Sequence, residues 1–145
     1  MSVFVDTGVY YALQNQRANR HAVAVNALEA VSDGRFGTVY TSDYIFDEAV
    51  TLVRSRTGCY EEAQTVADRI LGRNGFPRVP DLLHVDQTVF DHAVEVFDRY
   101  DDHPLSFTDA TTVALVEGWG IDAVLSFDDD FEGLVPRVDP VTLAS

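Results

Sequence analysis

The sequence predicts an α/β domain with a parallel central sheet and helices on both faces. Short apolar runs, such as Ser2–Val5 and Ala123–Ser126, are typical of buried strands. Longer amphipathic stretches separate these runs, and strands that alternate with helices indicate a parallel sheet covered on both sides. The 145 residues contain no internal repeat, low-complexity tract or linker, so a single domain over 1–145 is the simplest organisation.

The first half of the chain is expected to hold two strands and four helices. Ser42 is placed to cap the third helix, which reaches Arg56, and Gly58 is its natural stop. In chain order the expected elements are a strand at 2–5, helices at 7–14 and about 19–32, a strand at 37–41, and helices at 43–56 and about 60–71.

The second half follows the same alternation after a loop rich in Gly and Pro. Asp86 caps a helix whose apolar stripe ends at Tyr100, and Ser106 opens the next helix. In chain order we expect a loop at 72–80, a strand at 82–85, helices at 87–100 and 107 to about 118–120, a strand at 123–126, and an edge strand at 137–138.

The charge balance is strongly acidic. Twenty-four acidic residues, seventeen of them Asp, face ten basic residues, all of them Arg, and the net charge is −14. Such an excess normally discourages binding to a polyanion. Acidic chains that use Arg and no Lys also resemble proteins of halophilic organisms, where molar salt shortens the Debye length to about 3 Å. We therefore interpret the net charge as a sign of a high-salt solvent and not as evidence about the ligand, and it does not exclude a nucleic-acid substrate.

Composition also bears on the compartment. No apolar run approaches the ~18–20 residues of a membrane span, and the N-terminal segment lacks the pattern of a secretion signal. Cys59 is the single cysteine, so no disulfide can form within the chain. We expect a cytoplasmic protein with no membrane association.

Two acids fall where a parallel sheet of this kind binds ligands, outside the carboxyl ends of its strands, and a third lies in a nearby helix. Asp6 directly follows the first strand, and Asp128 follows the fourth by two residues. Asp109 lies in the first turn of the helix before the fourth strand. We expect these carboxylates to meet at one rim of the sheet.

Glu48 adds a fourth acid on the inward face of its helix. It lies three residues after Ile45 and four before Leu52, within the apolar stripe. A lone carboxylate there would be costly to desolvate and needs a partner. Asp47 is a rival, but its side chain should point about 100° away, towards solvent.

Converging carboxylates require a cation, because they repel one another and would otherwise be protonated. An all-oxygen cluster suits Mg²⁺ or Mn²⁺ better than zinc. Such ions can activate a water and stabilise the charge on a phosphate under in-line attack. The residues alone therefore favour metal-assisted phosphodiester hydrolysis.

At this point the sequence resembles the PIN-domain family. Val3–Gly8 is similar to the family's opening strand and first acid, and Asn19–Ala24 to the His-x-x-Ala start of its second helix. Tyr40–Glu48 resembles the segment with the family's glutamate. The strongest similarity lies in Leu105–Ala110 followed by Ala123–Phe131. The segments occur in family order and span nearly the whole chain.

The resemblance implies a three-layer αβα sandwich around a mainly parallel sheet of four or five strands, and endoribonuclease activity. It makes Asp6, Glu48 and Asp109 ligands of Mg²⁺ or Mn²⁺, with Asp128 as the fourth acid and Asp130 as a possible fifth. Chains of this length resemble VapC-like toxins, which form homodimers and are inhibited by a small antitoxin protein. One of three hydroxyls, that of Thr7, Thr108 or Ser126, could hydrogen-bond a carboxylate or a metal-bound water.

Structural explanations remain open for several of these acids. Ser106 and Asp109 have the spacing of a capping box, and Asp6 with Thr7 could cap the first helix. The run at 128–130 could be a solvated acidic turn. None of these explanations accounts for Glu48 on an apolar stripe.

Rival functions make different demands on the sequence. Aspartic proteases need two Asp-Thr-Gly loops on an all-β frame, and receiver domains need a Lys at the site. Phosphatases with an Asp nucleophile need Asp-x-Asp, but Gly8 holds the second place. Two alternatives stay open: a non-catalytic PIN-like module that binds RNA or protein, and a PIN nuclease of RNA maturation.

Overall fold

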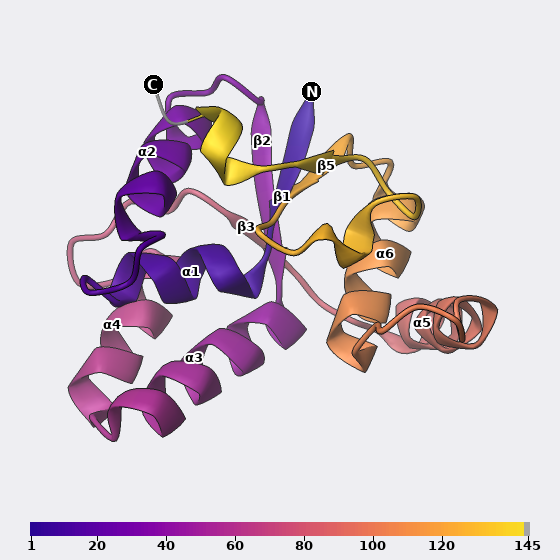
Figure 1. The fold of residues 1–145 in the computed structure, drawn as a ribbon, viewed down its shortest axis with the longest axis horizontal. Coiled ribbons are helices and arrows are strands. Elements are labelled where there is room, and N and C mark those ends of the chain that lie inside the picture. The colour runs from indigo at the N-terminus through magenta and orange to yellow at the C-terminus, as the bar shows by residue number, and fades with distance from the viewer. Residues whose placement is uncertain (144–145) are drawn as a thin grey trace.

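The computed structural model describes residues 1–143, and a five-stranded parallel sheet lies at its centre (Figure 1). The strands are ordered β3-β2-β1-β4-β5 across the sheet. Every neighbouring pair runs parallel. The strands are Ser2–Val5 (β1), Thr38–Ser42 (β2), Asp81–Leu83 (β3), Ala123–Leu125 (β4) and Arg137–Val138 (β5). The predicted parallel sheet and its edge strand are confirmed.

Helices cover both faces of this sheet, as the alternation of strands and helices predicts. Figure 1 shows α1 and α2 on one side of the strands and α5 and α6 on the other. The helices are Thr7–Gln14 (α1), His21–Ser32 (α2), Asp43–Thr57 (α3), Tyr60–Leu71 (α4), Gln87–Arg99 (α5) and Phe107–Trp119 (α6). Two 3₁₀ turns follow, Asp129–Phe131 (η1) and Pro140–Leu143 (η2). Within residues 1–143, no helix combines the length and the apolar character that a membrane crossing requires.

The middle strand β1 is deeply buried. Val3, Phe4 and Val5 are each at most 1% exposed, as expected for a strand with a helical layer on both sides. Its carboxyl end is therefore enclosed by the helices that pack on either face. Asp6, the residue that leaves this strand, is only 6% exposed.

The helix ends follow the local rules that the sequence suggested. Ser42 Oγ accepts a hydrogen bond of 3.2 Å from the Ile45 N–H and so caps α3. Gly58 ends this helix with φ of 66°, a left-handed conformation that costs glycine little. Asp86 caps α5 in the same way as Ser42, by accepting from the Val89 N–H at 2.9 Å.

Several element boundaries differ from prediction by one or two residues, and two of these differences have identifiable reasons. Helix α2 begins at His21 and not at Asn19, because residues 15–20 form turns, with the His21 N–H donating to Ala18 O. Strand β3 ends at Leu83 because the Val85 N–H donates to the Asp43 carboxylate and not to the neighbouring strand. Long-range polar contacts of this kind leave no signal in a local sequence pattern.

Candidate active site

Asp6 and Ser126 lie side by side where the two central strands end. Val5 pairs with Leu125 in the parallel register, so the next residue of each strand emerges at the same place. The Asp6 N–H continues the pairing by donating to Leu125 O at 3.1 Å. Ser126 Oγ donates to Asp6 Oδ2 at 2.7 Å, and both residues are buried. Of the three hydroxyls expected to bind a carboxylate, Ser126 does so.

Glu48 reaches the same place from α3. Its neighbours Ile45 and Ala49 are fully buried in the core, and Glu48 itself is half-buried. Asp47 is exposed, and its Oδ1 accepts a 3.4 Å hydrogen bond from the Thr51 hydroxyl on the helix surface. The predicted inward direction of Glu48 and outward direction of Asp47 are therefore both observed.

The four predicted acids Asp6, Glu48, Asp109 and Asp128 line a single open cleft of about 600 Å³. Segments far apart in the chain supply this cleft, because they meet at the carboxyl edge of the sheet. The remaining lining residues are Thr7, Gly8, Arg20, Ser106, Ser126, Phe127 and Asp129. Asp130, the predicted fifth acid, is not part of the lining, whereas its neighbour Asp129 is.

The acids perturb one another's ionisation. Burial, followed by the charges of Asp109 and Glu48, raises the pKa of Asp6 from 3.8 to about 7, although the Ser126 hydrogen bond opposes the shift. Burial and the charges of Asp128 and Glu48 raise the pKa of Asp109 from 3.8 to about 6. The cleft therefore concentrates negative charge that a cation would stabilise.

The spacing of the carboxylates is uneven. In the described part of the chain, only Asp128, Asp129 and Asp130 place three carboxylate oxygens within 4.8 Å of one another. Asp6, Glu48 and Asp109 do not form such a group, so the carboxylate oxygens of at least one pair among them are more than 4.8 Å apart. Neighbours in a short acidic turn can approach closely through the backbone alone, so proximity at 128–130 says less about a ligand than convergence from separate elements.

Asp109 and Asp128 also serve the local backbone. Ser106 Oγ accepts from the Asp109 N–H at 3.0 Å, and Asp109 Oδ2 accepts from the Ser106 N–H at 3.2 Å, which completes a capping box. Asp128 Oδ1 accepts from the Asp130 N–H at 2.8 Å and caps η1. Each of these bonds occupies one carboxylate oxygen and leaves the other available to a ligand.

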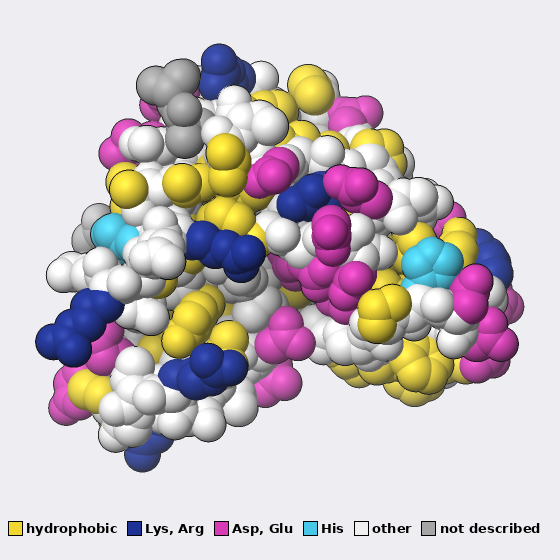
Figure 2. All heavy atoms as spheres, viewed as in Figure 1, with side chains coloured by type: hydrophobic (Ala, Val, Ile, Leu, Met, Phe, Trp, Pro, Cys, Tyr) yellow, Lys and Arg dark blue, Asp and Glu magenta, His cyan; other side chains and the backbone are white. Residues whose placement is uncertain are grey.

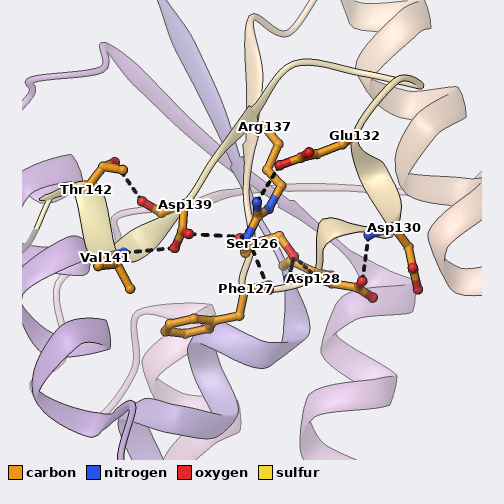
Figure 3. A network of polar contacts seen from close by, with 10 residues as sticks. Ser126, Phe127, Asp128, Asp130, Glu132, Arg137, Asp139, Val141 and Thr142 are labelled. Carbon is orange, nitrogen blue, oxygen red and sulfur yellow. Dashed lines mark hydrogen bonds and ion pairs between the residues drawn. The ribbon is translucent and has the colours of Figure 1, made fainter.

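Arg137 holds the loop that carries Asp128 (Figure 3). Its side chain is only 10% exposed, and Nε and Nη2 donate to the carbonyls of Ser126 and Phe127 at 3.0 and 3.2 Å. Glu132 accepts from Nη1 at 2.8 Å, and Asp139 lies 3.6 Å from Nη2. The sequence predicted Arg137 only as an edge-strand residue, because nothing local reveals a side chain that reaches back across a loop.

Two further cleft residues are Arg20, to which the sequence assigned no role, and Thr7, one of the three candidate hydroxyls. The Arg20 guanidinium carbon lies 4.7 Å from the centre of the Phe127 ring and places a cation at the cleft. Thr7 Oγ1 is buried at the same cleft without a hydrogen-bond partner. An orphaned buried hydroxyl is costly, so this atom indicates that the cleft binds something polar. Thr108, the third candidate hydroxyl, does not line the cleft.

Comparison with known proteins agrees with this geometry. The family model described as PIN domain matches residues 3–134, which include all four acids. The chain belongs to the PIN domain family. The 23S rRNA-specific endonuclease VapC20 of Mycobacterium tuberculosis is 30% identical over 129 residues, covering 89% of this chain and 91% of that relative. A VapC ribonuclease of Archaeoglobus fulgidus is 25% identical over 134 residues, covering 90% and 80%.

Solved structures of PIN proteins share the fold. The crystal structure of Mycobacterium tuberculosis VapC20, described as a Sarcin-Ricin loop cleaving toxin, matches with a TM-score of 0.78 over 92% of this chain and 96% of that one, at 30% identity. VapBC2 from Rickettsia felis, bound to a DNA fragment from its promoter, matches with a TM-score of 0.71 over 95% and 98%. At 13% identity the second match shows the fold alone.

Proposed function

We propose that this PIN domain protein is a metal-dependent endoribonuclease and the toxin of a type II toxin–antitoxin pair. The observation that carries the proposal is one cleft lined by Asp6, Glu48, Asp109 and Asp128, which come from four separate parts of the chain. The similarity to VapC20, a 23S rRNA-specific endonuclease, supports an RNA substrate. The similarity to VapC proteins supports a small antitoxin as partner, and a homodimer remains a prediction of the family resemblance.

The residues present fit a hard divalent cation. The donor set is all oxygen, which suits Mg²⁺ or Mn²⁺. Burial first, and then the charges of neighbouring acids, raise the pKa values of Asp6 and Asp109, and a bound cation would oppose both effects. We assign Asp6, Glu48, Asp109 and Asp128 as metal ligands, with Asp130 as the candidate fifth acid, acting directly or through water. When bound, the cation would activate a water and stabilise the charge that builds on the phosphate.

The protein's own groups prepare the cleft for this chemistry. Ser126 fixes Asp6 through its hydroxyl and accepts the Asp128 N–H at 2.9 Å, so one side chain orients two acids. Arg137 fixes the carbonyl oxygens of Ser126 and Phe127. Arg20 offers a cation to a phosphate oxygen beside the acids. Preorganised groups of this kind require little rearrangement at the moment of reaction.

Cleavage of RNA by purified protein, with and without EDTA, tests the proposal. We expect cleavage that EDTA abolishes and that Mn²⁺ or Mg²⁺ restores, with 5′-phosphate and 3′-hydroxyl ends because water is the nucleophile. Products with 2′,3′-cyclic phosphate would indicate metal-free attack by the ribose hydroxyl instead. Calorimetry with Mn²⁺ separates the enzyme from a non-catalytic RNA-binding module. The enzyme should show a heat of metal binding that Asp6→Asn abolishes, whereas an inert module should show no such heat.

The partner assignment needs a separate observation. A short neighbouring reading frame whose product binds this protein and inhibits cleavage would support the toxin. A nuclease of RNA maturation would lack such a neighbour.

A further inference from the structure

A second groove lies further along the same two helices, α1 and α3, that contribute to the acid cleft. Gly8 lines the acid cleft, and Tyr11 and Asn15, three and seven residues further along the chain, line the second groove. On α3, Glu48 lines the acid cleft and Arg56 lines the second groove, and the two residues belong to one row spaced i, i+4, i+8. Eight residues of helix correspond to about 12 Å, so the groove opens roughly that far from the acids.

This groove, which we call the arginine groove, has a volume of about 610 Å³. Arg56 lies over the ring of Tyr11, with its guanidinium carbon 5.8 Å from the ring centre. Arg17 lines the groove from the loop between α1 and α2, the same loop that carries Arg20 to the acid cleft. The groove also contains Glu62, whose carboxylate is engaged by the Gln14 amide.

The arginines here are available to a ligand. None of Arg17, Arg20 and Arg56 makes an ion pair within residues 1–143, in a chain where acids outnumber basic residues by 24 to 10. Figure 2 shows several Arg side chains over the α1, α3 and α4 part of this face, beside the acidic side chains near its centre. A surface that combines unpaired Arg with an aromatic ring is suited to phosphate and base contacts.

We infer that the arginine groove binds the RNA strand that flanks the scissile phosphate. The inference rests on the proposed function, because it takes the acid cleft as the point of cleavage. A strand leaving that cleft would pass Arg20 and enter the groove, where Arg17 and Arg56 contact phosphates and Tyr11 offers a stacking surface. The Arg side chains are suited to a polyanion, and the groove lies on the same helices as the acid cleft, which favours the substrate over a separate protein ligand.

The experiment measures binding of a fluorescent single-stranded RNA oligonucleotide to the Asp109→Asn protein with Mg²⁺ over a range of KCl. We expect the double change Arg17→Ala/Arg56→Ala to weaken binding about tenfold and to lower the slope of log K against log salt by about 1.4, the value for two lost phosphate contacts. Arg35→Ala/Arg99→Ala is the matched control, because it removes the same charge from exposed positions outside both clefts.

Cys59 provides a second readout that does not depend on the variants. It is the single cysteine of the chain and lines the arginine groove. Saturating RNA should slow alkylation of its thiol several-fold in the Asp109→Asn protein. The control double variant should keep this protection, and Arg17→Ala/Arg56→Ala should lose it at the same RNA concentration.

The outcomes separate this inference from the nuclease proposal. Equal affinities and salt slopes for the two double variants, or unchanged alkylation of Cys59, would overturn the inference even if the wild type cleaves RNA. Loss of antitoxin binding with intact RNA binding in Arg17→Ala/Arg56→Ala would also overturn it, since the groove would then dock protein. RNA bound in the groove without metal-dependent cleavage by the wild type would remove the nuclease and leave the groove assignment standing.

Discussion

The Ser126 hydroxyl donates a 2.7 Å hydrogen bond to Asp6 Oδ2 between adjacent strands of the sheet. Ser126 Oγ also accepts a 2.9 Å hydrogen bond from the Asp128 N–H, so this serine links the acid that leaves β1 to the acid that follows β4. The two bonds set the relative position of two carboxylates.

Replacing Ser126 by Ala should therefore weaken both folding and metal binding. We expect a loss of about 1–3 kcal/mol in the free energy of unfolding, because the buried Asp6 oxygen loses its donor. Metal affinity should fall by about tenfold to a hundredfold, as for other groups that orient ligands. Denaturant melts and Mn²⁺ calorimetry measure the two effects. Ser55→Ala, at an exposed position on α3, is the control and should change neither.

Glu48→Gln and Asp47→Asn form a matched pair on one helix. Glu48 lines the acid cleft and Asp47 faces solvent. Both substitutions remove one negative charge, so a difference between them reports where the side chain points and not the net charge. We expect Glu48→Gln to lower kcat at least about a hundredfold and Asp47→Asn to leave it within about twofold. Steady-state cleavage of a fluorescent RNA measures both. Equal effects in the two variants would remove Glu48 from the site.

Asp109→Asn separates the role of this residue in the cleft from its role in the capping box. Asparagine can still accept from the Ser106 N–H, so the free energy of unfolding should change by less than about 1 kcal/mol while cleavage is lost. Ser106→Ala calibrates the loss of the cap, which should cost about 1 kcal/mol. Retained cleavage in folded Asp109→Asn would assign the residue to capping alone.

The stability of metal-free protein should fall as pH rises from about 4 to about 8. The pKa of Asp6 is about 7 in the folded protein against 3.8 ordinarily, so the folded state binds more protons than the unfolded state over this range. Stability is therefore greatest below pH 4 for this group and is lost as pH passes 7, by a few kcal/mol. Asp109, with a pKa of about 6, acts in the same direction.

Chemical denaturation at several pH values in EDTA measures this dependence. Asp6→Asn should flatten the profile and stabilise the metal-free protein at pH 8, and saturating Mn²⁺ should also raise stability there. A wild-type profile that rises between pH 5 and 8 would show that the acids are compensated without a metal.

Salt should stabilise the fold. The net charge of −14 repels itself most at low ionic strength, and about 1 M KCl shortens the screening length to about 3 Å. We expect the melting temperature to rise steadily from about 0.1 M to about 2 M KCl. Arg35→Ala, which makes the charge more negative, should steepen the rise, and a melting temperature that does not change with KCl would contradict the halophilic interpretation.

The sequence predicts the fold well because local rules decide most of it. The apolar run before Asp6, the cap at Ser42 and the glycine stop at Gly58 each act within a few residues. The parallel order then follows from alternation, and with it the meeting of Asp6 and Asp128 at one edge. Glu48 could be oriented by helical periodicity alone, which is why its partial burial was predictable.

Contacts between distant segments limited the rest of the prediction. Arg137 reaches the carbonyls of residues 126 and 127 from the next strand, and Arg20 reaches Phe127 from a loop over 100 residues away in the chain. Neither contact leaves a periodic or motif signal. Asp129 lines the acid cleft and Asp130 does not, because residues 129–131 form a 3₁₀ turn. A run of acidic residues does not specify that conformation.

The bonds from Arg137 to the 126–127 carbonyls have a consequence for synthesis on the ribosome. Chains fold from the N-terminus as they emerge, and the segment with Asp6, Glu48 and Asp109 emerges well before residue 137. The loop that presents Asp128 stays without its clamp until residue 137 has also left the exit tunnel. A nascent chain that ends before residue 137 would hold the acids but not the clamp that fixes the loop of Asp128.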